Sequence, residues 1–298
     1  MNERLPFVAL VTCFEDRENI NYPAVRKQVQ RQVAAGNHIL CCGTNGDFTS
    51  LTFEEKLRLC AEVVEQAAGK VKVFVNVGTP STYETILLGR EMVKIGVDGI
   101  AVITPYFIGC TQEGLFTHFS RVADALQRPV YLYDIPARTQ NHIEPATAAR
   151  LAEHPNILGI KDSGGTKETI DAYLEIANGR DDFDVFSGPD SLIFYALSHG
   201  AKGCISGLGN VMPGPLNAIC KEFDKGDLAA SERQQELFTQ LRIDLYALGY
   251  APAMVKRALY LMDASVGASR QPALLSTPEL DAKIRAILEK HALISLCG

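Results

Sequence analysis

The sequence predicts an α/β fold, a (β/α)₈ (TIM) barrel with a C-terminal three-helix extension. Two observations predict the barrel. Short runs rich in Val, Ile, Phe and Tyr recur eight times before residue 207, and each is followed by a longer segment with helical features. Strands that alternate with helices of this length pair in parallel through right-handed crossovers, and eight such units close a barrel. A doubly wound open sheet is the alternative, but no G-x-G-x-x-G motif follows the first strand.

The predicted strands consist mainly of β-branched and aromatic residues, which favour extended structure. In a barrel of this class the active site lies at the carboxyl ends of the strands, on the loops that follow them. We therefore expect the functional residues on those loops. The strands are predicted at residues 7–12, 38–42, 71–76, 99–103, 130–133, 158–161, 184–187 and 203–206.

Segment 52–69 illustrates the helices predicted between the strands. Thr52 and Glu55 form a capping box at its start, and Gly69 is expected to end the helix. Segment 81–96 has the same helical character. Four residues of the first segment recur at the spacing of one helix face: Leu57, Cys60, Ala61 and Val64.

After Pro213 the strand pattern stops. Segments 215–249, 251–263 and 278–293 all have helical periodicity, and no Pro/Ser-rich linker separates them from the barrel. The alternative is that these segments are simply the outer helices of the last βα unit, but this accounts only for the first of the three. We therefore predict a barrel over residues 1–211 and a helical region over residues 212–298 that packs on it.

Composition and charge argue against several classes of protein. A chain of 298 residues with 47% hydrophobic content can bury a large core. Its formal net charge is −6, and its charged residues are scattered along the sequence, without a basic stripe for nucleic acid or a polybasic patch for a membrane. The early apolar run 5–14 is too short to span a bilayer and lacks the features of a secretory signal. We expect a cytoplasmic protein that binds neither nucleic acid nor membranes.

The eight cysteines and six histidines do not indicate a metal site. Cys41 and Cys42 are adjacent, the other cysteines are far apart in sequence, and no C-x-x-C, H-x-x-x-H or H-E-x-x-H spacing occurs. Buried, reduced thiols fit a cytoplasmic protein better than disulfides do. We therefore expect no metal in the site.

Lys161 ends the sixth predicted strand, within the segment NILGIKDSGG (residues 156–165). An ammonium is poorly suited to an apolar interior. At this strand end the amine would point into the mouth of the barrel, where partial desolvation favours its neutral form. A neutral amine can attack a ketone and form an imine, which draws electrons from the adjacent carbon. The alternative is a lysine that pairs with Asp162 and has no catalytic role.

Tyr133 ends the fifth strand, one strand away from Lys161. A phenol beside an imine can act as general acid and base, although Tyr133 could also simply fill the barrel as Tyr131 would. Arg138 follows in the same loop. Its guanidinium can hold a carboxylate through two hydrogen bonds, unless it is an ordinary surface charge.

The turn CGTNGD, residues 42–47, follows the second strand. Backbone N–H groups in such a turn can form a concave seat for an anion, and Thr44 adds a hydroxyl. This seat suits the carboxylate of a 2-oxo acid. Many glycine-rich turns, however, bind nothing.

Together these segments resemble the pyruvate-dependent class I aldolases typified by dihydrodipicolinate synthase and N-acetylneuraminate lyase. GTNGD (43–47) corresponds to the G-[TS]-x-G-E turn of that family, and YDIP (133–136) to its Y-[ND]-x-P motif. GIKD (159–162) matches the Schiff-base lysine motif, and GCISGLGNVMP (203–213) matches the segment around the eighth strand. The resemblance runs along the chain from LVTCF to the helical tail.

The resemblance implies that Lys161 forms an imine with pyruvate, or with the 2-oxo acid that yields it, and that no separate cofactor is needed. Tyr133 would be the acid and base, with Thr44 as its relay partner. The backbone amides of Thr44 and Asn45 would bind the pyruvyl carboxylate, and Ile205 would line the site. The family also implies a homotetramer built as a dimer of tight dimers.

The resemblance leaves the second substrate, an aldehyde, open. Arg138 favours a dihydrodipicolinate synthase, which condenses pyruvate with aspartate semialdehyde. Asn45 and Phe107 stand where that enzyme has a threonine and a relay tyrosine, and they argue against it. In the sugar-acid lyases the loops after strands seven and eight bind hydroxyls, a role that Asp190 and Ser206 could take unless they only stabilise turns.

Tyr106 and Gly188 complete the predicted substrate-binding set, although the Tyr106 side chain should point away from the position of Phe107. We favour reversible aldol cleavage of a 4-hydroxy-2-oxo acid or a 2-keto-3-deoxy sugar acid to pyruvate plus an aldehyde, with the synthase as the alternative. A third possibility is a barrel that binds a phosphorylated ligand through the loops after strands seven and eight, without imine chemistry.

Overall fold

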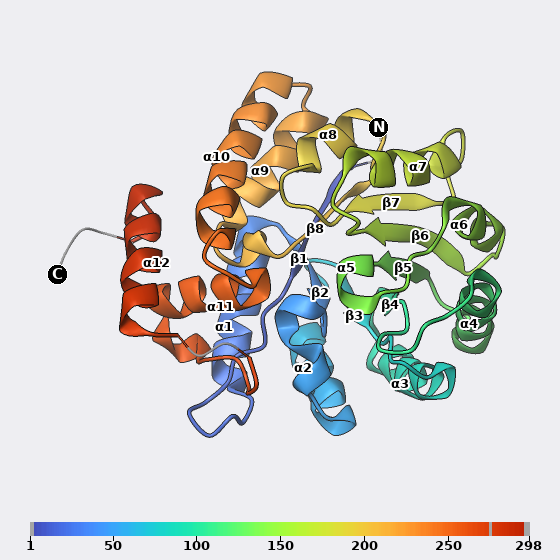
Figure 1. Cartoon of the computed structure of the whole chain (residues 1–298), viewed down its shortest axis with the longest axis horizontal. Helices are drawn as coiled ribbons and strands as arrows, with labels where there is room; N and C mark the ends of the chain where they lie inside the picture. The colour runs from blue at the N-terminus through green and yellow to red at the C-terminus, as the bar shows by residue number, and fades with distance from the viewer. Residues whose placement is uncertain (1–2, 274–275, 295–298) are drawn as a thin grey trace.

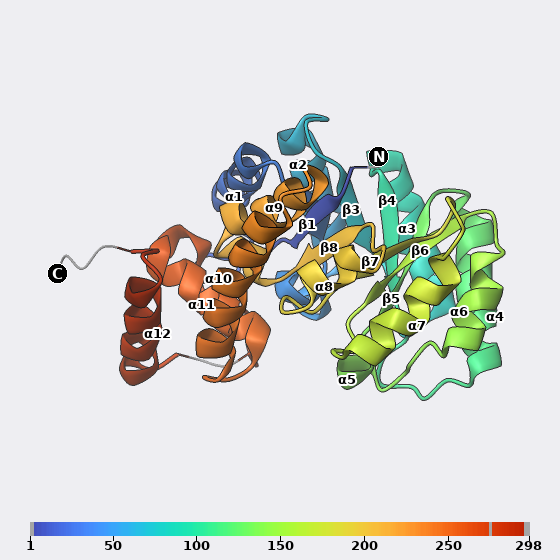
Figure 2. The same ribbon diagram turned by 90° about the horizontal axis from the view of Figure 1, so that it is seen from above.

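The computed structural model describes residues 3–273 and 276–294. Its eight strands pair in parallel and in chain order to form one closed barrel, with β1 joined to β8. Helices surround this barrel, and α10, α11 and α12 group on the side opposite α4 and α6, as Figures 1 and 2 show. The predicted (β/α)₈ barrel with a C-terminal helical extension is confirmed.

The strands lie close to their predicted positions, and β1 is the main exception. The observed strand begins and ends earlier than the predicted range, 7–12, because the chain leaves the ladder after the Leu10 amide has donated to the Leu40 carbonyl. Val11 donates instead to the side chain of Asn210, and the Thr12 hydroxyl donates to the carbonyl of Gly46. The strands are β1 (Leu5–Ala9), β2 (His38–Cys41), β3 (Val73–Asn76), β4 (Gly99–Ile103), β5 (Val130–Asp134), β6 (Ile157–Asp162), β7 (Asp184–Ser187) and β8 (Gly203–Ser206).

Aromatic and aliphatic side chains fill the interior of the barrel, so it is a packed core rather than a pore. The rings of Phe7 and Phe74 lie 4.5 Å apart, and Tyr131 stacks on Phe74 at 4.7 Å. Tyr131 therefore takes the filling role expected of it. Because successive side chains of a strand alternate, the residues next to these point outward to the helices.

The helices between the strands cover the outside of the barrel. At the start of α2 the predicted capping box forms between Thr52 and Glu55. Helix α2 buries Lys56, Leu59, Cys60, Val63 and Ala67. Of the four residues at helical spacing, Cys60 is buried, Leu57 and Val64 are half-buried against the core, and Ala61 is exposed. The helices are α1 (Tyr22–Ala35), α2 (Phe53–Ala67), α3 (Thr82–Ile95), α4 (Gln112–Leu126), α5 (Pro136–Thr139), α6 (Pro145–Ala152), α7 (Lys167–Ala177) and α8 (Ile193–Ser198).

The C-terminal part contains four helices rather than the three predicted segments. Segment 215–249 is divided by Gly226, whose φ of 81° only glycine adopts readily, so α9 ends before α10 begins. Helix α9 completes the eighth βα unit, and the three that follow form the extension. The four helices are α9 (Pro213–Asp224), α10 (Leu228–Tyr246), α11 (Ala251–Met262) and α12 (Pro278–Lys290).

Asn210 connects the end of β1 to the turn after β8, at the carboxyl end of the barrel. It lies in the short 3₁₀ turn η3 (Leu208–Asn210) that follows β8. Its side-chain oxygen accepts from the Val11 amide at 3.1 Å, and its side-chain nitrogen donates to the carbonyl of Ala9 at 2.8 Å. One buried amide therefore satisfies two backbone groups that β1 leaves unpaired where it ends.

The seven cysteines in the described part of the chain are free thiols, and six of them are buried. Within residues 3–273 and 276–294, no cluster of three or more potential ligand side chains could hold a metal ion. None of the helices found in these two ranges combines the length and apolar character needed to cross a membrane.

Candidate active site

Lys161 lies near the end of β6, between Tyr133 of β5 and Phe186 of β7. Its side chain is 5% exposed, and its Nζ lies 3.9 Å from the centre of the Tyr133 ring. Asp162 points to the other face of the strand, where its oxygens accept from the Gly164 amide and the Thr169 hydroxyl. Lys161 therefore does not pair with its neighbour, and its amine faces the barrel mouth.

Tyr133 connects the lysine to the turn after β2. Its phenol oxygen lies 3.0 Å from the Thr44 hydroxyl, and either oxygen can donate this hydrogen bond. The Tyr133 ring is buried. The amine, the phenol and the hydroxyl come from three different strand ends, and the structure brings them together, with a hydrogen bond between the phenol and the hydroxyl.

The turn that carries Thr44 is a short 3₁₀ helix, η1 (Thr44–Gly46). The first N–H groups of such a turn have no acceptor within it and are available to an anion. The side chain of Asn45 packs against Gly207, where an added Cβ would lie 2.6 Å from the Asn45 amide nitrogen. Gly207 is thus needed for the loops after β2 and β8 to approach each other.

These groups line a cavity of about 220 Å³ at the carboxyl end of the barrel. Eight of the ten predicted site residues line it, and Tyr106 and Ser206 do not. Tyr106 packs edge-on against Phe48 instead. The lining residues are Thr44, Asn45, Tyr133, Ile135, Arg138, Lys161, Ser163, Gly165, Gly188, Pro189, Asp190, Ile205, Gly207, Arg242, Tyr246, Ala251 and Pro252.

Asp190 is held by hydrogen bonds from within the protein. One oxygen accepts from the Ser206 hydroxyl at 2.5 Å, and the other from the Tyr246 phenol at 2.9 Å and the Leu208 amide at 3.3 Å. Burial raises the pKa of this carboxyl above its usual value, and these bonds oppose the shift. Both carboxyl oxygens are thus already engaged, and Ser206 contacts Asp190 rather than the cavity.

Gly188 has a packing role as well as a place in the lining. A Cβ added there would lie 2.1 Å from the Ser163 hydroxyl and 2.5 Å from the Asp162 carbonyl. A real side chain does not fit at these distances. The glycine therefore lets the loop after β7 lie directly on the loop after β6.

The C-terminal extension supplies cavity residues that the sequence did not reveal. Arg242 and Tyr246 of α10 line the cavity together with Ala251 and Pro252 of α11. The neighbouring Tyr250 lies under Arg138, with the guanidinium carbon 4.3 Å from the centre of its ring. Helical periodicity predicts the buried residues of such a helix, but it does not say that a polar side chain beside them reaches an active site.

A buried ion pair holds the Thr44 turn from behind. Asp47 follows this turn with a left-handed φ of 53°, and its carboxylate lies 2.7 Å from the amine of Lys256 on α11. Lys256 is 2% exposed and lies 4.2 Å from the centre of the Phe14 ring. Burial lowers the pKa of Lys256, and Asp47 opposes this shift.

A second buried cluster lies on the outer face of β5 and β6. Asp134 accepts from the Tyr173 phenol at 3.0 Å and lies 2.7 Å from Nδ1 of His142. The hydrogen bond to Asp134 raises the pKa of His142. Asp162 pairs with Asp134 in the sheet register, and burial raises the pKa of Asp162 to about 6.

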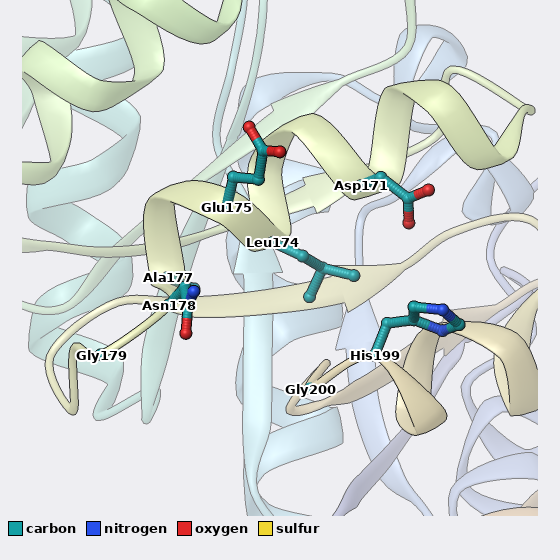
Figure 3. Close-up of a pocket in the computed structure, with 8 residues that line it drawn as sticks. All are labelled: Asp171, Leu174, Glu175, Ala177, Asn178, Gly179, His199 and Gly200. Atoms are coloured by element: carbon teal, nitrogen blue, oxygen red, sulfur yellow. The ribbon is translucent and has the colours of Figure 1, made fainter.

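A further hollow of about 580 Å³ lies between α7 and α8, outside the barrel (Figure 3). Leu174 of α7 and His199, which follows α8, face each other across it. Asp171, at its rim, accepts from the Tyr195 phenol. This hollow contains none of the predicted site residues.

Comparison with known proteins shows the family to which the chain belongs. The model of the dihydrodipicolinate synthetase family matches residues 4–291. A 4-hydroxy-tetrahydrodipicolinate synthase from Trichlorobacter lovleyi is 37% identical over 288 residues, covering 96% of this chain and 98% of the relative. The synthase of the same name from Geobacter sulfurreducens is 35% identical with the same coverage.

Solved structures give the same result. Dihydrodipicolinate synthase from Bacillus anthracis is 30% identical, with a TM-score of 0.89 and coverage of 97% of this chain and 98% of that one. The enzyme from Acinetobacter baumannii, solved with pyruvate, is 28% identical, with a TM-score of 0.92 and coverage of 99% and 100%. A monomeric dihydrodipicolinate synthase variant, 29% identical, also has a TM-score of 0.92, with coverage of 98% of each chain. The chain therefore belongs to the dihydrodipicolinate synthetase family, and it is a lyase of that family.

Proposed function

We propose that the protein is a class I aldolase that cleaves a 4-hydroxy-2-oxo acid, or a 2-keto-3-deoxy sugar acid, reversibly to pyruvate and an aldehyde through an imine on Lys161. The observation that carries this proposal is the contact between the Lys161 amine and the Tyr133 ring, next to the 3.0 Å contact between the Tyr133 and Thr44 hydroxyls. A nucleophilic amine beside a proton relay is what imine chemistry requires. No separate cofactor enters this reaction.

The reaction begins when the free amine of Lys161 adds to the C2 carbonyl of the substrate. Water leaves, and the resulting iminium keeps a positive charge next to C3. The substrate carboxylate would be seated on the first N–H groups of the turn at Thr44 and Asn45. This seat would hold C2 within reach of the amine.

Cleavage then moves one proton and one electron pair. The Tyr133 oxygen accepts the proton of the C4 hydroxyl, while its own proton passes along the hydrogen bond to Thr44. Thr44 in turn gives up its hydroxyl proton to the water molecule that imine formation released into the cavity. The C3–C4 bond breaks, its electrons enter the iminium to give an enamine, and the aldehyde leaves. Return of a proton to C3 and hydrolysis of the imine release pyruvate and the free lysine.

The second candidate runs in the direction of synthesis. It is the condensation of pyruvate with aspartate semialdehyde, and two observations favour it. The curated relatives described above carry the name of that synthase, and Arg138 lines the cavity with no ion pair in the described part of the chain. Phe107 argues against it, because a phenylalanine has no hydroxyl with which to extend a proton relay.

We also propose a cytoplasmic homotetramer, a dimer of tight dimers. The buried free thiols suit a reducing compartment. Phe107 is 99% exposed, and a large apolar side chain in this state is typical of a surface that another chain covers. The monomeric variant among the structural relatives shows that assembly varies among proteins of this fold.

Borohydride trapping tests the proposal. Incubation with pyruvate and borohydride should reduce the imine and leave a stable pyruvyl adduct on Lys161 and on no other lysine, as peptide mass mapping can show. Lys161→Ala should stay folded, form no adduct and lose turnover. A barrel that only binds phosphorylated ligands would form no adduct in the wild type or in Lys161→Ala. The absence of an adduct in the wild type would exclude imine catalysis. A panel of hydroxy-oxo acids, with pyruvate release coupled to lactate dehydrogenase, would then identify the substrate.

A further inference from the structure

Two guanidinium groups line the active-site cavity, and neither has an anionic partner among the residues that the structure describes. Arg138 comes from α5, and Arg242 comes from α10. Within the described ranges no carboxylate lies within 4.0 Å of either guanidinium, and neither donates a hydrogen bond. Arginine is always charged in proteins, so both groups carry a full positive charge into the cavity.

Arg242 is held in place by Tyr246. Its guanidinium carbon lies 5.3 Å from the centre of the Tyr246 ring, four residues further along α10. The phenol of that tyrosine donates to Asp190. The guanidinium therefore has an anchored aromatic ring on one side, and the Arg242 side chain is half-buried.

Asp190 cannot serve Arg242 as a full partner. Its two oxygens already accept three hydrogen bonds, from Ser206, Leu208 and Tyr246. Arg242 attracts the Asp190 carboxylate electrostatically but shares no hydrogen bond with it in the described part of the chain. The planar donors of the guanidinium are left available to another acceptor with two oxygens.

The charge of the cavity points in the same direction. Its lining includes the cations Lys161, Arg138 and Arg242 and one acidic side chain, Asp190. This local excess of positive charge occurs in a protein whose formal net charge is −6. The iminium keeps the charge of Lys161, and the pyruvyl carboxylate balances it. Asp190 balances one of the two arginines, so one guanidinium charge would remain unbalanced and partly desolvated when a neutral aldehyde fills the cavity, which is unfavourable.

We propose that Arg242 is a specificity-determining residue that, together with Arg138, binds a carboxylate on the end of the substrate remote from the pyruvyl group. The aldehyde partner is then an acidic aldehyde rather than a neutral sugar aldehyde. This inference rests on the proposed aldolase function and narrows its substrate class.

The test measures KM and kcat for two substrates of equal length in the wild type and in variants that replace an arginine of α10. One 4-hydroxy-2-oxo acid ends in a second carboxylate, and the other ends in a hydroxymethyl group. Arg242→Gln should raise KM for the diacid by about 10- to 100-fold, the usual range for loss of a charge-assisted hydrogen bond. KM for the neutral-ended substrate and kcat for both should change less than about twofold.

Two further variants separate recognition from folding. Arg233→Gln removes the same charge from an exposed position of α10 and should change neither KM. Arg242→Lys keeps a charge near Asp190 but loses the planar fork, so it should raise KM for the diacid alone and by a smaller factor. An equal loss for both substrates in Arg242→Lys would show that Arg242 only supports Asp190, and it would overturn the proposal.

Borohydride trapping with pyruvate keeps the two hypotheses apart, because pyruvate does not reach the remote end of the substrate. A wild-type protein without an adduct on Lys161 would refute the aldolase function itself. An adduct in all variants, combined with an unchanged KM for the diacid in Arg242→Gln, would refute only the role of Arg242. A wild-type preference for the neutral-ended substrate would refute it as well.

Discussion

Replacement of Lys256 by methionine should destabilise the protein strongly and slow the reaction. The substitution removes the ammonium but keeps an unbranched side chain of similar length next to Phe14. It leaves the Asp47 carboxylate, 17% exposed, without its partner 2.7 Å away. Breaking a buried pair in this way typically costs about 3–5 kcal/mol, because one charge remains uncompensated. We expect a loss of this size in the free energy of unfolding, measured by urea denaturation.

Lys27→Met is the matched control. Lys27 lies 2.8 Å from Asp263, a similar distance, but its side chain is 65% exposed. Exposed pairs of this kind contribute about 0–1 kcal/mol. The same chemical change should therefore have a small effect at this position and a large one at position 256.

The double variant Asp47→Asn/Lys256→Met provides a sharper test of the cause. Asparagine tolerates the left-handed backbone of position 47 and removes the charge that Lys256→Met leaves unpaired. The double variant should therefore regain part of the stability lost by Lys256→Met. All of these variants should still form the pyruvyl adduct, while kcat falls in Lys256→Met because the Thr44 turn loses its support. The reasoning is refuted if Lys256→Met destabilises no more than Lys27→Met, or if the double variant is no more stable than the single one.

Three other predictions concern the catalytic relay, the second substrate and pH. Tyr133→Phe should still form the imine, slowly, and should lower kcat by roughly 10²- to 10⁴-fold, which single-turnover kinetics can check. If the missing hydroxyl limits the synthase reaction, Phe107→Tyr should raise the rate of condensation with aspartate semialdehyde, and efficient condensation by the unmodified protein would contradict this point. Arg138→Ala should lower kcat/KM for the same reaction by the factor that corresponds to a loss of about 1.5–3 kcal/mol in binding energy. Burial raises the pKa of Asp162 to about 6, above roughly 3.9 in the unfolded chain. The folded state therefore holds this proton more tightly than the unfolded chain does. As the pH rises from about 4 to 6, the free energy of unfolding should fall by up to roughly 1.4 kcal/mol per pH unit. Asp162→Asn should remove this slope, and parallel pH profiles for the two proteins would refute the assignment.

The barrel and the centre of its site could be predicted because chain order determines them. Parallel strands linked by crossovers bring all their carboxyl ends to one face, so Thr44, Tyr133 and Lys161 were expected together from their positions at strand ends alone. The site roles expected from the sequence remain predictions, but the closeness of these three side chains is now a structural observation.

The contribution of α10 could not be predicted in the same way. Arg233 and Arg242 look alike in the sequence, and only the docking of the helix on the barrel turns one of them toward the cavity and leaves the other in solvent. Asp190 shows a related limit. A turn aspartate can face a ligand or a buried tyrosine, and its partner here, Tyr246, lies far along the chain.

The closure of the barrel between β1 and β8 has a consequence for the order in which the molecule is made. Strand β1 leaves the ribosome first, but its second neighbour, β8, is among the last parts of the barrel to appear. At about 5–20 residues per second, one edge of the growing sheet stays unpaired for roughly 10–40 s. Open edges of this kind can pair with other chains, so the unpaired edge of β1 is a site of possible mispairing until β8 has been made. Lys256 appears later still, and a ribosome-bound chain that has already closed its barrel therefore still lacks the ion pair that supports Thr44.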